Sequence, residues 1–199
     1  MLWPSPPWDE VTYWALDLET GGLDARHDAI VSVGMVPIRH GVIRLGDAFE
    51  SLVRSDGTST VRPDSVAVHE VVPAEVRGAP RLSEVLVSVD ARLAEGALLV
   101  HNAAIDVAFL RRAYAEHRMK WPKLVVVDTV QLIFKLAKRR RFLEPDSVKE
   151  PSINLSAARQ ELGLPPYPAH NALMDAVATA ELFLVLRQKL AARTLGQLR

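Results

Sequence analysis

The sequence predicts an α/β domain built on a mixed, five-stranded sheet that is flanked by helices. The first observation behind this prediction is the stretch from Val11 to Leu16, which is largely apolar on both faces, as in a strand covered on both sides. The second is a pair of β-rich segments, residues 29–41 and 42–53, that follow it closely. The third is the alternation of apolar strands and helical patterns after residue 80. Three β segments followed by such an alternation indicate a mixed sheet with helices packed on it.

The remaining elements can be assigned in chain order. The two β-rich segments meet at His40-Gly41 and are expected to form an antiparallel meander with the first strand. Residues 55–63 form a polar loop in this assignment, and residues 65–76 form a turn-rich segment. Periodic apolar residues then predict helices over 81–95, 103–117, 129–138, 153–162 and 171–191, strands over 97–103 and 124–128, and an exposed loop over 139–151.

We expect one folded domain over residues 11–191, preceded by a Pro- and Trp-rich arm over 1–10 and followed by a short tail over 192–199. The chain of 199 residues can bury a substantial core, and its 49% hydrophobic content argues against disorder. Lys and Arg total 24, as do Asp and Glu, so the net charge gives no indication of a polyanionic partner. Any basic surface must therefore be local.

Several features favour a cytoplasmic protein that does not enter a membrane. Cysteine is absent, which excludes a disulfide framework and a thiolate metal site and suits a reducing compartment. The first residues lack the basic region and following apolar region of a signal peptide. No uninterrupted apolar run reaches the ~20 residues that a membrane helix needs. Nothing in the sequence indicates an oligomeric state.

The first strand ends in two carboxylates, Asp17 and Glu19. Side chains two residues apart share one face of a strand, so these two negative charges lie side by side. Because they repel each other, either one is protonated or a cation lies between them. Thr20, Gly21 and Gly22 then end the strand with residues that permit a close backbone approach. The pattern suits a metal cradle, although an acid at a strand end is also a common turn former or salt-bridge partner.

Two more acids, Asp106 and Asp175, lie on apolar helical stripes. The residues that share their stripes at helical spacing are Phe109, Leu110, Ala113 and Tyr114 for the first, and Ala178, Thr179, Leu182 and Phe183 for the second. A carboxylate on a packed face is costly unless it is paired. For Asp106 the alternative is an acid at a helix N-terminus, favoured by the macrodipole. His170 precedes Asp175 by five residues and either leans over the same opening or serves as a helix-entry residue.

Four carboxylates and one imidazole, without cysteine, indicate a site for a hard cation. Oxygen ligands suit Mg²⁺ or Mn²⁺, whereas a structural zinc site would want more His or Cys. Two such ions stabilise both the attacking and the leaving oxygen of an in-line phosphoryl displacement. A histidine that titrates near neutrality can take the proton from the attacking water. The sequence therefore predicts metal-assisted phosphodiester hydrolysis with two divalent cations.

These residues together resemble the motifs of the DnaQ-like 3′–5′ exonucleases of the DEDDh type. The first motif is similar to DLETGGL with Asp17 and Glu19, the second to HNAAIDVAFL with Asp106, and the third to HNALMDA with His170 and Asp175. The spacing in the third motif matches the histidine subclass of this family. Smaller matches are LVVVDT and NLSAARQELGLP, and the resemblance extends in order from about Thr12 to Leu186.

The resemblance implies a ribonuclease-H-like fold and a role for each central residue. Asp17, Glu19 and Asp175 would hold the metal ions, with Asp17 shared between them. Asp106 would hold the second ion directly or through water, and His170 would be the general base.

The resemblance also implies substrate contacts. Thr20 would place its backbone near the terminal nucleotide, and Asn102 matches a substrate-contacting Asn. His69 resembles another cleft residue, although Glu70 follows it where relatives usually have Gly; Gly21 stands where many relatives have a second Thr. Apart from the resemblance, Leu18 and Leu23 flank the turn that carries Asp17 and Glu19, and they either wedge against the last base or pack in the core. The expected substrate contacts are Leu18, Thr20, Gly21, Leu23, His69, Asn102 and Phe109.

The leading hypothesis is a 3′–5′ exonuclease that releases nucleoside monophosphates from a single-stranded or frayed 3′ end, with DNA favoured over RNA. A DNA polymerase is a candidate partner, because the order of motifs is most similar to proofreading subunits. One alternative is an exoribonuclease that trims RNA or degrades oligonucleotides. Another is a non-catalytic, polymerase-associated module, but such a module has no reason to keep buried, repelling acids.

Two further features have two interpretations each. The basic run Lys138-Arg139-Arg140-Arg141, with Lys135, either steers phosphates toward the site or forms a solvated helix end. Trp3 and Trp8 either stack on bases or clasp the N-terminal arm to the domain.

Overall fold

The computed structural model describes residues 5–54, 78–143 and 150–199. Within them, six strands form one mixed sheet in the order β3-β2-β1-β5-β6, and β4 also pairs with β2. The strands are β1 (Tyr13–Thr20), β2 (Ile30–Arg39), β3 (Val42–Ile43), β4 (Phe49–Leu52), β5 (Ala97–Val100) and β6 (Val126–Asp128). β1 is antiparallel to β2 but parallel to β5, which is parallel to β6.

The predicted fold class and the antiparallel meander are confirmed. The sheet gains a sixth strand because residues 42–53 form two short strands, β3 and β4, separated by the 3₁₀ helix η2 (Leu45–Asp47). Arg44 and Leu45 therefore lie at the start of a helical turn and not, as expected, in the middle of a strand. The expected segments at 55–63 and 65–76, including His69, lie outside the described residues.

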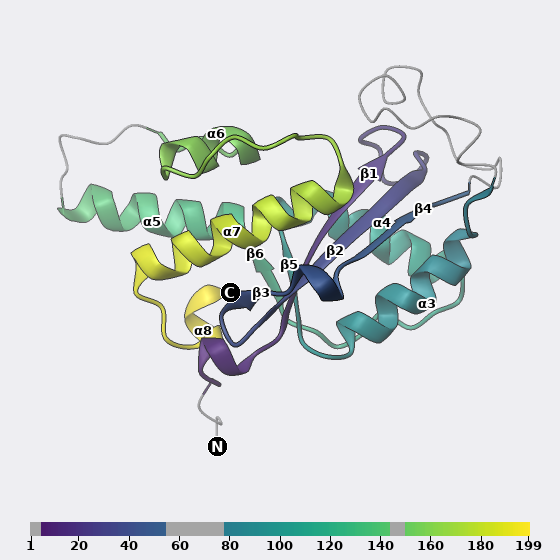
Figure 1. Cartoon of the computed structure of the whole chain (residues 1–199), viewed down its shortest axis with the longest axis horizontal. Coiled ribbons are helices and arrows are strands. Elements are labelled where there is room, and N and C mark those ends of the chain that lie inside the picture. The colour runs from purple at the N-terminus through teal and green to yellow at the C-terminus, as the bar shows by residue number, and fades with distance from the viewer. Residues whose placement is uncertain (1–4, 55–77, 144–149) are drawn as a thin grey trace.

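Helices cover both faces of the sheet (Figure 1). One layer contains α5 (Thr129–Leu143), α6 (Leu155–Glu161) and α7 (Ala172–Leu190), with α7 packed on β1 and β2. The other layer contains α3 (Leu82–Leu93) and α4 (Ala103–Glu116). Across the described part of the chain, none of the helices combines the length and apolarity that crossing a membrane requires.

The central strand β1 divides its side chains between the two layers. Tyr13 and Ala15 are buried in the cluster beneath α7, whereas Trp14 and Leu16 are buried in the cluster beneath α3 and α4. Because the alternation continues along the strand, Asp17 and Glu19 follow Tyr13 and Ala15 on the α7 face. The two-residue alternation of the strand thus decides which layer of helices faces the two acids.

Helix α5 continues to Leu143, beyond the expected end at about residue 138, so the basic run is helical and not the start of a loop. Two of its members satisfy main-chain oxygens: Arg139 donates to the carbonyl of Leu190 at 3.0 Å, and Lys135 donates to that of Arg199. Cations at helix C-termini are favoured by the exposed carbonyl groups there. This arrangement favours the helix-end interpretation of the run.

The two ends of the described chain pack against each other. The 3₁₀ helix η1 (Trp8–Glu10) lies beside α8 (Leu195–Leu198) (Figure 1), and the Trp8 amide donates to the carbonyl of Arg193 at 3.0 Å. The Trp8 ring packs on the core cluster beneath α7, with the Arg187 guanidinium 4.1 Å from its centroid. These contacts fit the clasp interpretation of Trp8; Trp3 lies outside the described residues.

Candidate active site

Three carboxylates from two elements meet at the end of β1. Asp17 and Glu19 come from the strand and Asp175 comes from the first turn of α7, and one oxygen from each lies within 4.8 Å of the others. Glu19 is only 6% exposed, and the other two are partly exposed toward a cleft. The structure therefore brings together acids that are more than 150 residues apart in the sequence.

The start of α7 holds Asp175 in place. Asn171 is the N-cap, and its side-chain oxygen accepts a hydrogen bond from the Met174 amide at 2.9 Å. One oxygen of Asp175 accepts from the His170 amide at 3.0 Å, and the other accepts from the Tyr167 hydroxyl at 2.5 Å. The cap fixes where the helix begins, and the two hydrogen bonds fix how the carboxylate is turned.

Asp106 reaches the same cleft from the opposite layer. It is 5% exposed, lies in the first turn of α4 and accepts a hydrogen bond from the Leu18 amide of β1. Asp128, at the end of β6, accepts from the Asn102 and Ala103 amides at 3.0 and 3.1 Å. Asp128 thus ties the start of α4 to the sheet edge, and so determines where Asp106 enters the cleft.

The acids raise one another's pKa values. Burial, followed by the charges of Asp106, Asp175 and Glu19, raises the pKa of Asp17 well above its usual range. Burial and then Asp175 raise the pKa of Glu19 to about 7. Burial, reinforced by Asp128 and Glu19, raises the pKa of Asp106 to about 7, although amide hydrogen bonds oppose the shift. Such mutual destabilisation of the charged forms would be relieved by a cation among them.

The acids lie in a cleft of about 750 Å³ that also contains most of the predicted substrate contacts. Its lining includes the predicted Leu18, Thr20, Leu23, Asn102 and His170. His170 is exposed at the rim, and Leu23 is exposed over 79% of its surface. Leu18, at 8% exposure, both packs in the core and borders the cleft, so its two proposed roles are compatible.

Two predicted substrate contacts lie elsewhere, and a third is not described. Phe109 is fully buried in the core beneath α4 and does not border the cleft, because the stripe that carries Asp106 turns inward one helical turn later. Gly21 is buried, with its amide bonded to the Ala29 carbonyl at 2.8 Å, and its neighbour Gly22 borders the cleft instead. His69 lies outside the described residues.

One wall of the cleft is made by residues that the sequence did not predict to lie in the site. It is made by residues 153–156 with Tyr167, and His101 supports it: His101 Nε2 lies 2.8 Å from the Ile153 carbonyl oxygen and Nδ1 lies 2.7 Å from the Thr129 hydroxyl. Burial lowers the pKa of His101, which favours the neutral ring in this position. His101 adjoins Asn102 in the second motif, and this adjacency was the available signal.

The donor set fits a hard divalent cation. Three carboxylates within 4.8 Å of one another offer oxygen ligands alone, and Asp106 adds a fourth carboxylate along the cleft. The raised pKa values are the cost of holding these acids together without a counter-charge. The arrangement suits binding of a cation together with a phosphate ester, next to an exposed imidazole.

Comparison with known proteins agrees with this geometry. A family model described as exonuclease (RNase_T) matches residues 14–183. A DNA polymerase III subunit epsilon-like protein of Rhodobacter capsulatus is 35% identical over 194 residues, which cover 95% of this chain and 25% of that protein. A PolC-type DNA polymerase III of Clostridium perfringens is 32% identical over 170 residues, which cover 85% of this chain and 11% of that protein.

Solved structures share the fold. Exonuclease I of E. coli in complex with a dT13 oligonucleotide superposes with a TM-score of 0.75 at 16% identity, covering 91% of this chain and 42% of that chain. This likeness confirms the expected ribonuclease-H-like architecture. The chain spans a quarter or less of the length of the two polymerase-related proteins, and under half of exonuclease I.

Proposed function

This chain belongs to the exonuclease family whose model it matches over residues 14–183, and from that premise we propose that it hydrolyses phosphodiester bonds one at a time from the 3′ end of DNA. The observation that carries the proposal is the convergence of Asp17, Glu19 and Asp175 within 4.8 Å, in a cleft that also contains Asp106 and His170. The products would be nucleoside monophosphates.

Each residue has a role in this proposal. Asp17, Glu19 and Asp175 would hold two divalent cations, Mg²⁺ or Mn²⁺, with Asp106 assisting at the second. When bound, the ions would supply charge stabilisation to the attacking and leaving oxygens of the phosphoryl group. His170, exposed at the cleft rim, would accept the proton of the attacking water.

The cleft has the features of a site for a chain end. Its volume of about 750 Å³ suits a terminal nucleotide, and Leu23 and Ile153 border it with exposures of 79% and 53%. Exposed apolar side chains can contact the faces of unstacked bases. The acids, by contrast, would repel phosphates unless cations are present, so substrate binding at the reacting phosphate should depend on metal.

The comparison with similar proteins favours DNA over RNA as the substrate. The similar proteins include DNA polymerase III proteins, and the exonuclease I structure contains a dT13 oligonucleotide. For the same reason we propose a DNA polymerase as a candidate partner of this chain. A binding module without catalysis is disfavoured, because the buried acids Glu19 and Asp106, whose pKa values are raised, would then cost stability without use.

A digestion experiment tests the proposal. The purified chain is incubated with a single-stranded DNA, a DNA duplex with a frayed 3′ end and an RNA of the same sequence, each labelled at the 5′ or the 3′ end. With Mg²⁺ or Mn²⁺ we expect immediate mononucleotide release from the 3′ label and a shrinking ladder from the 5′ label. EDTA should stop both the mononucleotide release and the ladder. Asp17→Asn protein, purified in the same way, should also be inactive, which excludes a contaminating nuclease. A faster RNA ladder would reassign the substrate, and intact substrates would overturn the function.

A further inference from the structure

Tyr167 forms a hydrogen bond that links the loop before α7 to the acid cluster. Its hydroxyl donates to one oxygen of Asp175 at 2.5 Å, and the Ser156 hydroxyl bonds to the same phenol oxygen. Tyr167 and Ser156 both border the cleft. The phenol group thus stands between the cleft wall at α6 and the carboxylate at the start of α7.

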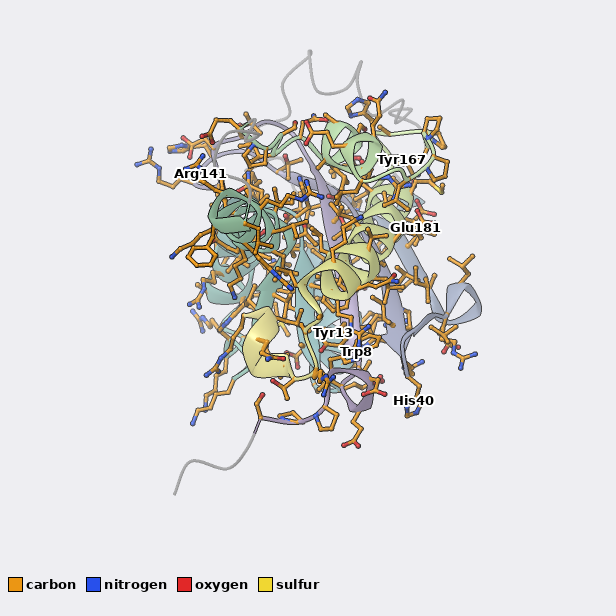
Figure 2. The ribbon with its side chains drawn as sticks, turned by 90° about the vertical axis from the view of Figure 1, so that its left-hand side faces the viewer. Trp8, Tyr13, His40, Arg141, Tyr167 and Glu181 are labelled. Carbon is orange, nitrogen blue, oxygen red and sulfur yellow. The ribbon has the colours of Figure 1, made fainter. Side chains whose placement is uncertain are left out.

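The Tyr167 ring is itself held by a buried arginine. Arg159 of α6 is 2% exposed, and its guanidinium carbon lies 4.8 Å from the Tyr167 ring centroid. Its Nη2 donates to the Pro165 carbonyl at 3.1 Å, while its Nη1 donates to the Ala178 carbonyl at 2.8 Å and pairs with Glu181 at 2.7 Å. Figure 2 shows Tyr167 and Glu181 close together at the same end of the molecule. One buried cation therefore joins α6, the Pro165 loop and α7.

We propose that Tyr167 is a positioning residue whose hydroxyl, braced by Arg159 and Ser156, fixes the orientation in which Asp175 meets a divalent cation. The inference rests on the proposed function, because it takes Asp175 as a metal ligand. A carboxylate oxygen has two lone-pair directions, so an oxygen that accepts from Tyr167 can still face an ion. With the His170 amide on the other oxygen, both ends of the carboxylate are fixed before the ion arrives.

The Tyr167 hydroxyl counteracts the electrostatic repulsion between Asp175 and the other acids. Asp17 and Glu19 lie on a strand of the central sheet, whereas Asp175 enters from a helix and its side chain must be turned toward them. Without the phenol, repulsion from the other acids would favour rotation of Asp175 away from the cluster. The Tyr167 hydroxyl opposes that rotation. Partners of metal ligands typically change metal affinity or activity by about 10–100-fold when they are removed.

The test removes only the hydroxyl. Tyr167→Phe keeps the ring that stacks on Arg159, and Tyr114→Phe is the matched control, since the Tyr114 hydroxyl donates to Asp90 away from the cleft. Mn²⁺ affinity of each full chain is measured by calorimetry without nucleic acid, followed by kcat and KM on single-stranded DNA. We expect Tyr167→Phe to weaken Mn²⁺ binding by about 10–100-fold and to lower kcat while KM for DNA changes little. Ser156→Ala should weaken Mn²⁺ binding in the same direction by less.

Each outcome decides a separate question. Wild-type Mn²⁺ affinity and kcat in Tyr167→Phe would overturn the positioning role while leaving the exonuclease proposal intact. An equal loss in Tyr114→Phe would also overturn it, because the loss would then be general. If wild-type protein binds Mn²⁺ but digests no nucleic acid, the affinity difference still supports the positioning role while the proposed function fails. If wild-type protein binds no Mn²⁺, both fall together.

Discussion

Gly34 of β2 lies so close to Ala172, the first residue of α7, that a Cβ atom on Gly34 would overlap the Ala172 backbone and the amide of Leu173. Gly34 is also the residue that pairs with Asp17 across the sheet. The missing side chain therefore lets the start of α7 approach the sheet next to the strand acids. That approach brings Asp175 within reach of Asp17 and Glu19.

Gly34→Ala is expected to disrupt the site as well as the fold. Because the overlap is with backbone atoms, α7 must shift, at a cost of about 1–3 kcal/mol of unfolding free energy. Displacement of Asp175 should lower turnover by about 10²-fold. Gly46→Ala is the control, because a Cβ there meets nothing within 4 Å. Urea denaturation measures the unfolding free energy, and DNA digestion measures the turnover. If Gly34→Ala kept the wild-type stability and turnover, the close approach of α7 to Gly34 would be refuted.

Asp17→Asn should abolish cleavage without unfolding the protein. It removes a charge that neighbouring acids oppose, so the variant in EDTA should melt at or above the wild-type temperature. Wild-type protein should gain about 2.7 kcal/mol of stability at a Mn²⁺ concentration near 100 times Kd, and the variant should gain much less. Calorimetric melting with EDTA and with Mn²⁺ measures both. Retained turnover in Asp17→Asn would remove Asp17 from the proposed mechanism.

The stability of the metal-free protein should fall as the pH rises. The pKa of Asp106 is about 7 in the folded chain, above the value of about 3.9 in an unfolded chain, so the folded state binds more protons between these limits. Its contribution to stability is fully present below about pH 4 and is lost as the pH rises through about 7. In EDTA at pH 8, the free energy of unfolding of Asp106→Asn should therefore exceed that of wild type by on the order of 2 kcal/mol.

The comparison of wild type and Asp106→Asn is made by urea denaturation at pH values from 5 to 8. The difference in unfolding free energy between the two proteins should grow with pH. Asp9→Asn, which changes an exposed acid in η1 outside the cleft, is the matched control for loss of one carboxylate. A difference that stayed constant with pH would mean that the Asp106 carboxyl is not held against its charged form.

His170→Asn should lower the rate of DNA cleavage by about 10²-fold at neutral pH. Asn tolerates the positive φ of 70° at this position, so the backbone that positions Asp175 should persist. His40→Asn is the matched control, because His40 is also exposed at a positive φ, of 52°, and lies at the other end of the molecule from Tyr167 (Figure 2). Single-turnover digestion measures the chemical step. A wild-type rate for His170→Asn at every pH would assign the proton transfer elsewhere.

The basic run on α5 should contribute little to DNA binding. Arg139 contacts the last turn of α7, 15 residues or about 22 Å along the helix from Asp175, and charges that far apart are largely screened at physiological salt. In Figure 2, Arg141 and Tyr167 lie on opposite sides of the view. Lys138→Ala with Arg140→Ala should therefore leave KM for DNA and its salt dependence within about twofold of wild type. A clear fall in the salt slope would restore the phosphate-steering interpretation.

The structure explains why some predictions from the sequence were more reliable than others. Asp106 and Asp175 could be recognised because a carboxylate on a core-facing stripe violates local chemistry, and such a violation is visible at helical spacing. Tyr167 could not, because an aromatic residue in a Pro-rich turn violates nothing locally, and for His101 the sequence offered only its place beside Asn102 in the second motif. Their importance comes from partners in other segments, Asp175 for the first and Ile153 for the second. Phe109 was misplaced for a related reason: periodicity identifies a stripe but does not tell where along it the core begins.

The sequence by itself determined the fold class, the family and the acids, because these depend on residue types at fixed spacing along one strand or one helix. Only the tertiary structure decided which atoms meet. The glycine that admits α7, the arginine that braces the Tyr167 loop and the aspartate that holds the start of α4 all act through contacts between residues distant in the chain. Distances between separate elements are set by packing and by hydrogen bonds across layers, and no local pattern encodes them.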